Sequence, residues 1–374
     1  MPTSKSKYNF LDKIFLPITI VMAISLILGT VAGNIDPRTN FLFAYFALAY
    51  PYSLFVCILF FIWWIIRKKW LFAFVVLAII LSGYNTLHTT FGFGGDEGQL
   101  EKETGSVRVM TYNVHSFKFY GEDNTIPAKE KMLQVVKDQN PDVVCFQEFY
   151  TRKAGKFNTI DSLKRMLNTK YYYFQPASDN DYEAFGLAIF SKYPIKHQDS
   201  ILFQGYGDNM SIYTDLDVNG KTIRIYNVHF QSISFQPQDY QFLDELTKKT
   251  RGKLYASKRI LRMLKRAFVK RSEQVDIMKA EMAKCKTPYL IAGDFNDTPA
   301  SYAVKKITKD LKNSFEEKGS GFGKTYNGKF PNFQIDYIAT SKDLDVLNYK
   351  IEKAKLSDHF PVRIDLKFSE NKSE

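Results

Sequence analysis

Cysteine is scarce in this chain, and its scarcity excludes two kinds of stabilising site. Only three cysteines, Cys57, Cys145 and Cys285, occur among 374 residues, and none stands in a CxxC pair or a Cys/His cluster. The sequence therefore predicts neither a structural zinc site nor a disulfide framework. No internal repeat is visible along the chain either.

Charge is missing from three long apolar runs, all of which lie in the first quarter of the chain. The runs cover residues 14–33, 41–66 and 70–88. About 20 apolar residues form a helix long enough to cross a bilayer. Residues 1–91 are therefore predicted to be a membrane region with about three transmembrane helices.

Lysine and arginine are nearly absent from the first loop between these runs, which indicates an orientation. The tail before residue 14 contains three lysines and residues 67–69 read Arg-Lys-Lys, whereas Arg38 is the one cation of the first loop. The positive-inside rule puts the tail and the second loop in the cytoplasm. Three crossings then predict a multi-pass protein of the cell (inner) membrane, whose C-terminal part lies on the periplasmic or extracytoplasmic side. Two alternatives stay open: the first run is a cleaved signal peptide, or the third is a buried core helix, which would leave the C-terminal part in the cytoplasm.

The remaining sequence is charged, with a formal net charge of +12 for the whole chain, which suits an anionic partner. Residues 92–105 are rich in glycine and acidic residues and are predicted to form a flexible linker. Residues 236–286 are predicted to be mostly helical, and residues 248–286 hold fourteen Lys or Arg against three acidic residues. This stretch is either a basic surface for anionic headgroups or polynucleotide, or the solvated outer face of packing helices. Residues 171–173 and Tyr206 are tyrosines that either line a substrate groove or belong to the core and its rim.

Short β-type runs alternate with helical stretches from residue 106 to residue 368, which predicts an α+β domain of sheets covered by helices. Polar side chains stand at or beside the ends of these runs, as in a site built on one rim of a sheet. They are Asn113, Glu148, His229, Asp294, Asn296, Asp336, Asp358 and His359.

These residue types favour metal-assisted phosphoryl chemistry. Four carboxylates can supply the hard oxygen ligands that Mg²⁺ or Mn²⁺ prefers. Crowded carboxylates repel one another and an anionic substrate unless a cation neutralises them. His229 and His359 can act as phosphate donors or as acid and base. Each residue alone has a structural explanation, such as a turn for residues 294–297, but Asp336 within an apolar run needs a partner or a metal.

Six strings in this order resemble the endonuclease/exonuclease/phosphatase superfamily, the DNase I-like fold. They are MTYNVHSF (110–117), CFQEF (145–149), NVHF (227–230), AGDFNDTP (292–299), QIDYI (334–338) and LSDHFPV (356–362). The resemblance covers residues 106–368 and implies a four-layer sandwich of two packed β-sheets flanked by helices, preceded here by the N-terminal helical transmembrane region. The chain looks like a membrane-anchored, bacterial-type member.

The resemblance also implies a role for each matched residue. Glu148, Asp358 and Asn113 are expected at the metal, Mg²⁺ or Mn²⁺. Asp294 and Asn296 position the attacking water, and Asp336 orients His359. Substrate contacts are implied for Asn113, His229, Asn296 and His359. Catalysis is expected by in-line attack of water on phosphorus, without a covalent enzyme intermediate.

Departures from the superfamily's patterns narrow the expected substrate. Abasic-site nucleases usually have Thr-Lys after the matched glutamate, whereas Glu148 precedes Phe149-Tyr150. We therefore expect a membrane-anchored phosphodiesterase or phosphatase that acts on lipid headgroups or small phosphorylated molecules, with no obligate protein partner. The alternatives are a surface-tethered endo- or exonuclease that cleaves nucleic acid, and an inactive module that binds anionic ligands.

Overall fold

Two six-stranded mixed sheets form the C-terminal domain, and the computed structural model describes residues 9–118, 125–203, 205, 207–233, 253–328 and 333–370. In the first sheet the strands lie in the order β13 (Leu344–Ile351), β14 (Val362–Phe368), β2 (Val107–Asn113), β3 (Val143–Arg152), β5 (Glu183–Ser191) and β4 (Tyr171–Asp179). In the second sheet the order is β10 (Lys312–Asn313), β12 (Asp336–Thr340), β9 (Tyr289–Asp294), β8 (Lys221–His229), β7 (Met210–Val218) and β6 (Ile195–Leu202). Only the pairs β2–β3 and β8–β9 are parallel among the strand pairs of these described sheets.

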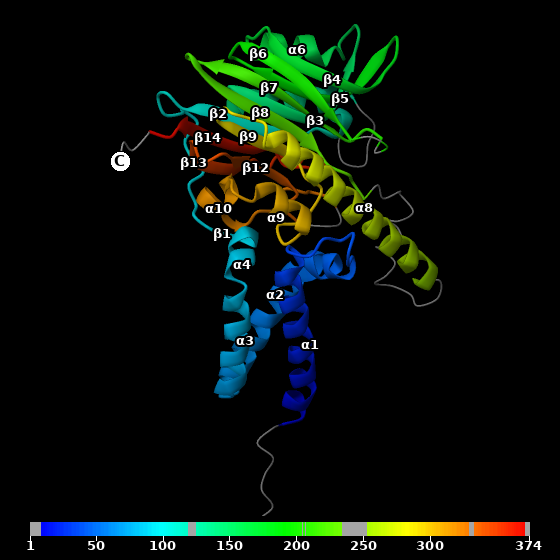
Figure 1. Ribbon diagram of the computed structural model, residues 1–374, viewed down its shortest axis with the longest axis vertical. Coiled ribbons are helices and arrows are strands. Elements are labelled where there is room, and N and C mark those ends of the chain that lie inside the picture. Colours follow the sequence, from blue (N-terminus) through cyan, green and yellow to red (C-terminus); the bar gives the residue numbers. More distant parts are fainter. Residues whose placement is uncertain are drawn as a thin grey trace, which may run out of the picture.

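Helices cover both outer faces, which makes four layers (Figure 1). The apolar core between the sheets joins residues such as Val109 and Ile225. The helices α5 (Ile126–Gln139) and α6 (Thr159–Met166) pack on the first sheet, and α8 (Lys253–Met282) and α9 (Tyr302–Thr308) pack on the second. The predicted sandwich of two sheets flanked by helices is confirmed.

The two sheets are joined below their shared rim by buried side-chain amides. Gln147 Nε2 of the first sheet donates to Asn227 Oδ1 of the second at 2.6 Å. Asn227 Nδ2 in turn donates to the carbonyls of Phe146 (2.9 Å) and Ala188 (3.0 Å). Buried polar groups that are paired in this way fix one alignment of the two sheets.

Two N-terminal helices, α1 (Phe10–Ala32) and α2 (Leu42–Ile66), are long and apolar enough to cross a membrane. The third apolar run differs from the continuous span that was predicted, because it forms α3 (Trp70–Ser82) and α4 (Tyr84–Thr90), which meet at an angle of 71°. Gly83 separates them, and a Cβ there would lie 2.8 Å from Thr30 Oγ1 of α1. Close packing against α1 thus coincides with the bend.

The segment after α4 lies along the C-terminal domain. Strand β1 (Phe91–Phe93) pairs with β11 (Ser320–Phe322), which follows the short helix α10 (Ser314–Lys318). Farther along, the buried guanidinium of Arg108 donates to the carbonyls of Gln99 (2.8 Å) and Leu100 (2.7 Å). The predicted linker therefore has fixed hydrogen-bond partners over part of its length.

The N-terminal helices also contact the domain directly. Arg38, in the loop between α1 and α2, donates to Asp276 of α8 at 2.7 Å. Tyr45 of α2 donates to the carbonyl of Leu261 at 2.6 Å, and its ring lies 5.5 Å from that of Phe268. The loop at the end of α1 is therefore on the same side as the sandwich, from which α1, α2 and α3 project (Figure 1).

The close approach of Gly293 on β9 to β8, which positions Asp294, can be tested by substitution. Its φ is +146°, and a Cβ would lie 2.0 Å from the carbonyl oxygen of Val228 on β8. We expect Gly293→Ala to lower the free energy of unfolding by about 3 kcal/mol or more, because two backbone segments must separate. Urea denaturation of the full chain in detergent measures this loss.

The matched control is Gly220→Ala, since Gly220 also has a positive φ (+86°) but has no atom within 4 Å of the added carbon. It should cost only about 1–2 kcal/mol, the usual penalty for a left-handed L-residue. Equal losses in both variants would show that the close approach to β8 is not what requires glycine.

Candidate active site

One rim of the sandwich gathers all eight residues singled out from the sequence. Strands β2, β8 and β9 end there and β3 passes it at Glu148, while the antiparallel strands β12 and β14 begin there. Asn113, His229 and Asp294 each end a strand, and Asp336 begins one. Chemical groups from distant parts of the chain therefore converge because strand ends meet at the same edge.

The backbone is irregular at two of these residues, Glu148 and Asn296, and this sets the direction of their side chains. The pairing of β3 with β5 is interrupted between Phe146 and Phe149, where Glu148 has a φ of +50°. A bulge of this kind turns a strand residue out of the regular alternation. Asn296 also has a positive φ (+55°), directly after the end of β9. Such strain persists only where the surrounding packing holds it, and it is typical of functional sites.

Asn113 joins the two sheets at the centre of the site. Its Nδ2 donates to Glu148 Oε1 at 3.2 Å and to Asp294 Oδ2 at 3.0 Å. His229 Nε2 lies 3.8 Å and 3.6 Å from the same two oxygens. The carboxylates of Glu148 and Asp294 therefore face a common space between the sheets.

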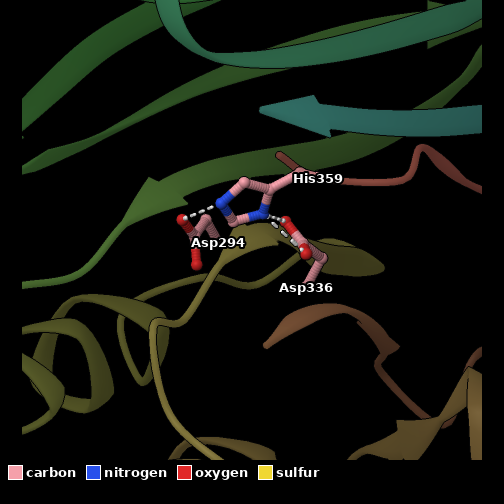
Figure 2. A group of neighbouring side chains, drawn as sticks. All are labelled: Asp294, Asp336 and His359. Atoms are coloured by element: carbon pink, nitrogen blue, oxygen red, sulfur yellow. Dashed lines mark hydrogen bonds and ion pairs between the residues drawn. The ribbon is translucent and has the colours of Figure 1, made fainter. Parts of the chain in front are cut away.

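Asp336 holds the imidazole of His359, as Figure 2 shows. His359 Nδ1 lies 2.9 Å and 3.1 Å from the two oxygens of Asp336, and its Nε2 lies 3.6 Å from Asp294 Oδ2. The three side chains are buried, and one ligand atom from each lies within 4.8 Å of the others, so this group can hold a metal ion. The sequence had predicted Asp336 as the group that orients His359, and that role stays a prediction.

Asn296 lies beside Asp294 and is bonded to the backbone. Its N–H donates to Asp294 Oδ1 at 2.8 Å, and its Nδ2 donates to the carbonyl of Phe230 at 2.9 Å. It thus fixes the carboxylate of Asp294 and ties the loop after β9 to the residue after His229.

His115 belongs to the site and was not assigned a role from the sequence. Its Nδ1 lies 3.3 Å from Glu148 Oε2 and 3.7 Å from Asp358 Oδ2. Asp358 is thereby placed near Glu148, and Ser357 anchors it by donating to the carbonyl of Asn113 at 2.9 Å. The sign of this in the sequence was the scarcity of histidine. The chain has five histidines, and three of them lie at this rim.

The environment separates the pKa values of the acidic groups in the metal-free protein. Burial, with the charge of Asp336, raises the pKa of Asp294 to about 6 against the attraction of two histidines. Burial alone would also raise the pKa of Glu148, but the hydrogen bond from His115 and nearby imidazoles bring it to about 2. Burial disfavours a charged His359, yet the carboxylates of Asp336 and Asp294 raise its pKa well above 6.5.

The charges of the site fit a divalent cation. Buried carboxylates elsewhere have arginine partners, as in Asp365 with Arg108 (2.6 Å) and Asp297 with Arg271 (2.9 Å). In the described part of the chain the ion-pair partners of Glu148, Asp294, Asp336 and Asp358 are histidines alone. The buried Nε2 of His229 has no hydrogen-bond partner among the described residues. Buried charges need neutralisation, and hard carboxylate oxygens suit Mg²⁺ or Mn²⁺.

Comparison with known proteins identifies similar families. Residues 110–359 match a model described as the endonuclease/exonuclease/phosphatase family, and residues 12–90 match one described as a domain of unknown function. None of the curated proteins matches the chain.

Solved structures share the fold at low identity. An endonuclease/exonuclease/phosphatase family protein from Bacteroides thetaiotaomicron is 16% identical, with 72% of this chain and 100% of that chain covered and a TM-score of 0.51. A mannosyl-6-phosphatase from the same species is 15% identical, with 70% and 100% covered and a TM-score of 0.50. The human Nocturnin catalytic domain with bound sulfate is 15% identical, with 72% and 97% covered and a TM-score of 0.50.

The raised pKa of Asp294 predicts that Asp294→Asn stabilises the metal-free protein. The folded state binds this proton more tightly than the unfolded chain, so stability falls as pH rises from about 4 through about 6. A shift of about two pKa units corresponds to at most about 3 kcal/mol, and this net shift already includes the attraction of the two histidines. We expect a gain of about 1–3 kcal/mol at pH 7.5, together with loss of hydrolysis.

Urea denaturation in the presence of a chelator, at several pH values, measures this gain. It should shrink toward pH 4, where the wild-type carboxyl is already neutral. A gain that is the same at pH 4 and pH 7.5 would contradict the titration of Asp294.

Proposed function

This chain is a phosphoesterase of the endonuclease/exonuclease/phosphatase family, and we propose that it is a membrane-anchored, metal-dependent enzyme that hydrolyses phosphodiester or phosphomonoester bonds of lipid headgroups or small phosphorylated molecules. One observation carries this proposal. Four carboxylates share a buried rim with three histidines, and no Lys or Arg among the described residues pairs with those carboxylates. Such a rim suits a substrate that arrives with a divalent cation and carries phosphoryl oxygens.

Glu148 and Asp358, with Asn113, are the residues that would hold Mg²⁺ or Mn²⁺. Both carboxylates approach His115 Nδ1, within 3.3 Å and 3.7 Å, so an imidazole stands where their negative charges converge. The alternative trio of Asp294, Asp336 and His359 is a weaker choice, because both oxygens of Asp336 already face His359 Nδ1. A bound divalent ion acts as a Lewis acid on the phosphoryl group and neutralises its charge.

The side chains around that position support attack by water. Asp294, with a pKa of about 6, is suited to accept a proton from the water whose oxygen attacks phosphorus. As the new P–O bond forms, the ester P–O bond breaks and the leaving oxygen takes up a proton. His229 and His359 donate to the phosphoryl oxygens, where charge grows in the transition state. Asp336 keeps His359 in the orientation that this requires.

A surface-tethered nuclease is the second candidate, and a basic groove favours it. The groove has a volume of about 370 Å³ and lies between residues 231–233, which follow His229 closely, and α8. Arg259, Arg266 and Lys270 of α8 line it. A polynucleotide backbone or an anionic headgroup can both bind such cations. The predicted stretch 236–286 lies partly outside the described residues, as does Tyr206.

Anchoring in a bacterial-type inner membrane, with the catalytic domain on the extracytoplasmic side, completes the proposal. The loop that contains Arg38 contacts the catalytic domain, whereas Arg67 of the second loop donates to Asp12 at 3.1 Å near the start of α1. The start of α1, which contains Lys13, and the second loop are therefore at the same end of the helices, away from the domain. The positive-inside rule assigns that end to the cytoplasm.

Removal of metal and of Glu148 tests the catalytic proposal. Hydrolysis of the soluble diester bis(4-nitrophenyl) phosphate by the full chain should stop with chelator and return with Mg²⁺ or Mn²⁺. Glu148→Gln should weaken Mn²⁺ binding about 100-fold or more in titration calorimetry, since even indirect contacts to a metal cost about 10–100-fold.

Asp336→Asn is the matched control, because it should keep Mn²⁺ binding while it slows hydrolysis. Loss of Mn²⁺ binding in Asp336→Asn with retention in Glu148→Gln would move the metal to the buried trio. The wild-type protein is then offered plasmid DNA, phosphatidylcholine and sphingomyelin vesicles, and inositol phosphates. Cleavage of plasmid DNA alone would favour the nuclease.

Sidedness is tested by labelling single thiols with an impermeant maleimide in bacterial spheroplasts. In a Cys285→Ser background, Tyr182→Cys places a thiol at a position that is 80% exposed in the domain. We expect it to react in intact spheroplasts, and Lys68→Cys in the second loop to react only after lysis. The reverse pattern would place the catalytic domain in the cytoplasm.

A further inference from the structure

An apolar groove runs between the membrane helix α2 and the catalytic domain. It has a volume of about 310 Å³. The aromatic residues that line it are Tyr52, Phe55, Phe322 and Phe333, and Pro51, Pro299 and Lys324 also contribute. Tyr52, Phe55 and Phe322 are each about half exposed (49%, 57% and 58%), so these rings are not needed to fill a core.

The groove continues into an exposed apolar stripe on α2. Below Phe55 the side chains of Leu59, Ile62 and Ile66 are 49%, 46% and 68% exposed and recur every three to four residues, on one face of the helix. Phe55 and Ile66 are eleven residue steps apart, which is about 17 Å along the helix axis at 1.5 Å per residue. Since a hydrocarbon core is about 30 Å thick, this stripe has about the depth of one leaflet.

At its other end, the groove is lined by residues close in sequence to the catalytic rim. Phe333 and Gln334 line it, and Asp336 is two residues farther on, at most about 7 Å along an extended chain. Leu48 of α2 packs in one cluster with Phe333 and Tyr326, and the Tyr326 ring lies 5.3 Å from the imidazole of His359. A series of packed apolar side chains therefore connects the exposed side of α2 with the rim that carries His359.

We propose that this groove binds an acyl chain of a phosphoester lipid, drawn from the bilayer that surrounds α2. This inference rests on the proposed function and names its substrate as a membrane lipid. The acyl chain lies on the α2 stripe and between Phe55 and Phe322, while the phosphoester reaches the carboxylate and imidazole rim. Lys324 also lines the groove, and its ammonium group provides a cation for an anionic headgroup.

A charged substitution at Phe322 tests the groove. Phe322→Asp lies outside the membrane helices, and a carboxylate there disfavours burial of an apolar chain in the groove. Full-length protein is assayed in phosphatidylcholine and phosphatidylglycerol vesicles for headgroup release, and in parallel with bis(4-nitrophenyl) phosphate. We expect the ratio of lipid to soluble turnover to fall about tenfold. The matched control Leu202→Asp, at an equally exposed position (58%) on β6, should leave the ratio unchanged.

Photolabelling gives a readout that does not depend on turnover. Phosphatidylcholine with a diazirine at the end of one acyl chain should label the peptides that contain Tyr52, Phe55 and Phe322, and Phe322→Asp should reduce that labelling. An unchanged turnover ratio, or labelling of α2 and α3 without the Phe322 peptide, would overturn the groove. If wild-type protein cleaved no phosphoester but the groove were labelled, the proposed function would fail and the lipid site would stand.

Discussion

Negative charge that is paired only with histidines among the described residues, at one rim of the sandwich, is the constraint on which the rest of the structure depends. Asp294 is 1% exposed and stands between Asn113, His229 and His359, with no arginine or lysine partner among the described residues. Elsewhere in the domain the buried Asp365 has Arg108. Repulsion of this kind is tolerated only when a cation or protons enter the site. The rim therefore favours a divalent ion and a phosphoester together over either alone.

Rigid packing around the rim is what holds that charge in place. The two sheets bury large side chains against each other, and the Gln147–Asn227 hydrogen bond fixes their alignment below the site. Glu148 and Asn296 keep positive φ angles that isolated peptides would avoid. The free energy stored in backbone strain and in the raised pKa of Asp294 is thus offset by burial elsewhere in the sandwich.

The sequence was sufficient to predict which side chains meet at this rim, because most of them stand at or beside the end of an apolar strand and the parallel pairs bring those ends together. Their catalytic roles stay predictions. The sequence was insufficient for strands whose side chains are mostly exposed, such as β6, where Lys196, His197 and Gln198 interrupt any apolar alternation. His115 was missed because its importance depends on the conformation of the turn after β2. The break at Gly83 was missed for a related reason, since contact with α1 is not visible in local composition.

The contacts between the N-terminal helices and the domain change what the proposed anchoring would mean for this enzyme. A simple tether would leave the active site free to rotate and to meet substrates in solution. Here Leu48 of α2 packs against the cluster that contains Tyr326, and the Tyr326 ring lies against the imidazole of His359, so one small cluster separates α2 from the candidate site. Interiors are too densely packed to absorb a displaced side chain without shifts in its neighbours. We therefore expect the orientation of His359 to depend on how α2 packs against the domain. The proposed lipid substrate would then enter along the helix that supports this rim.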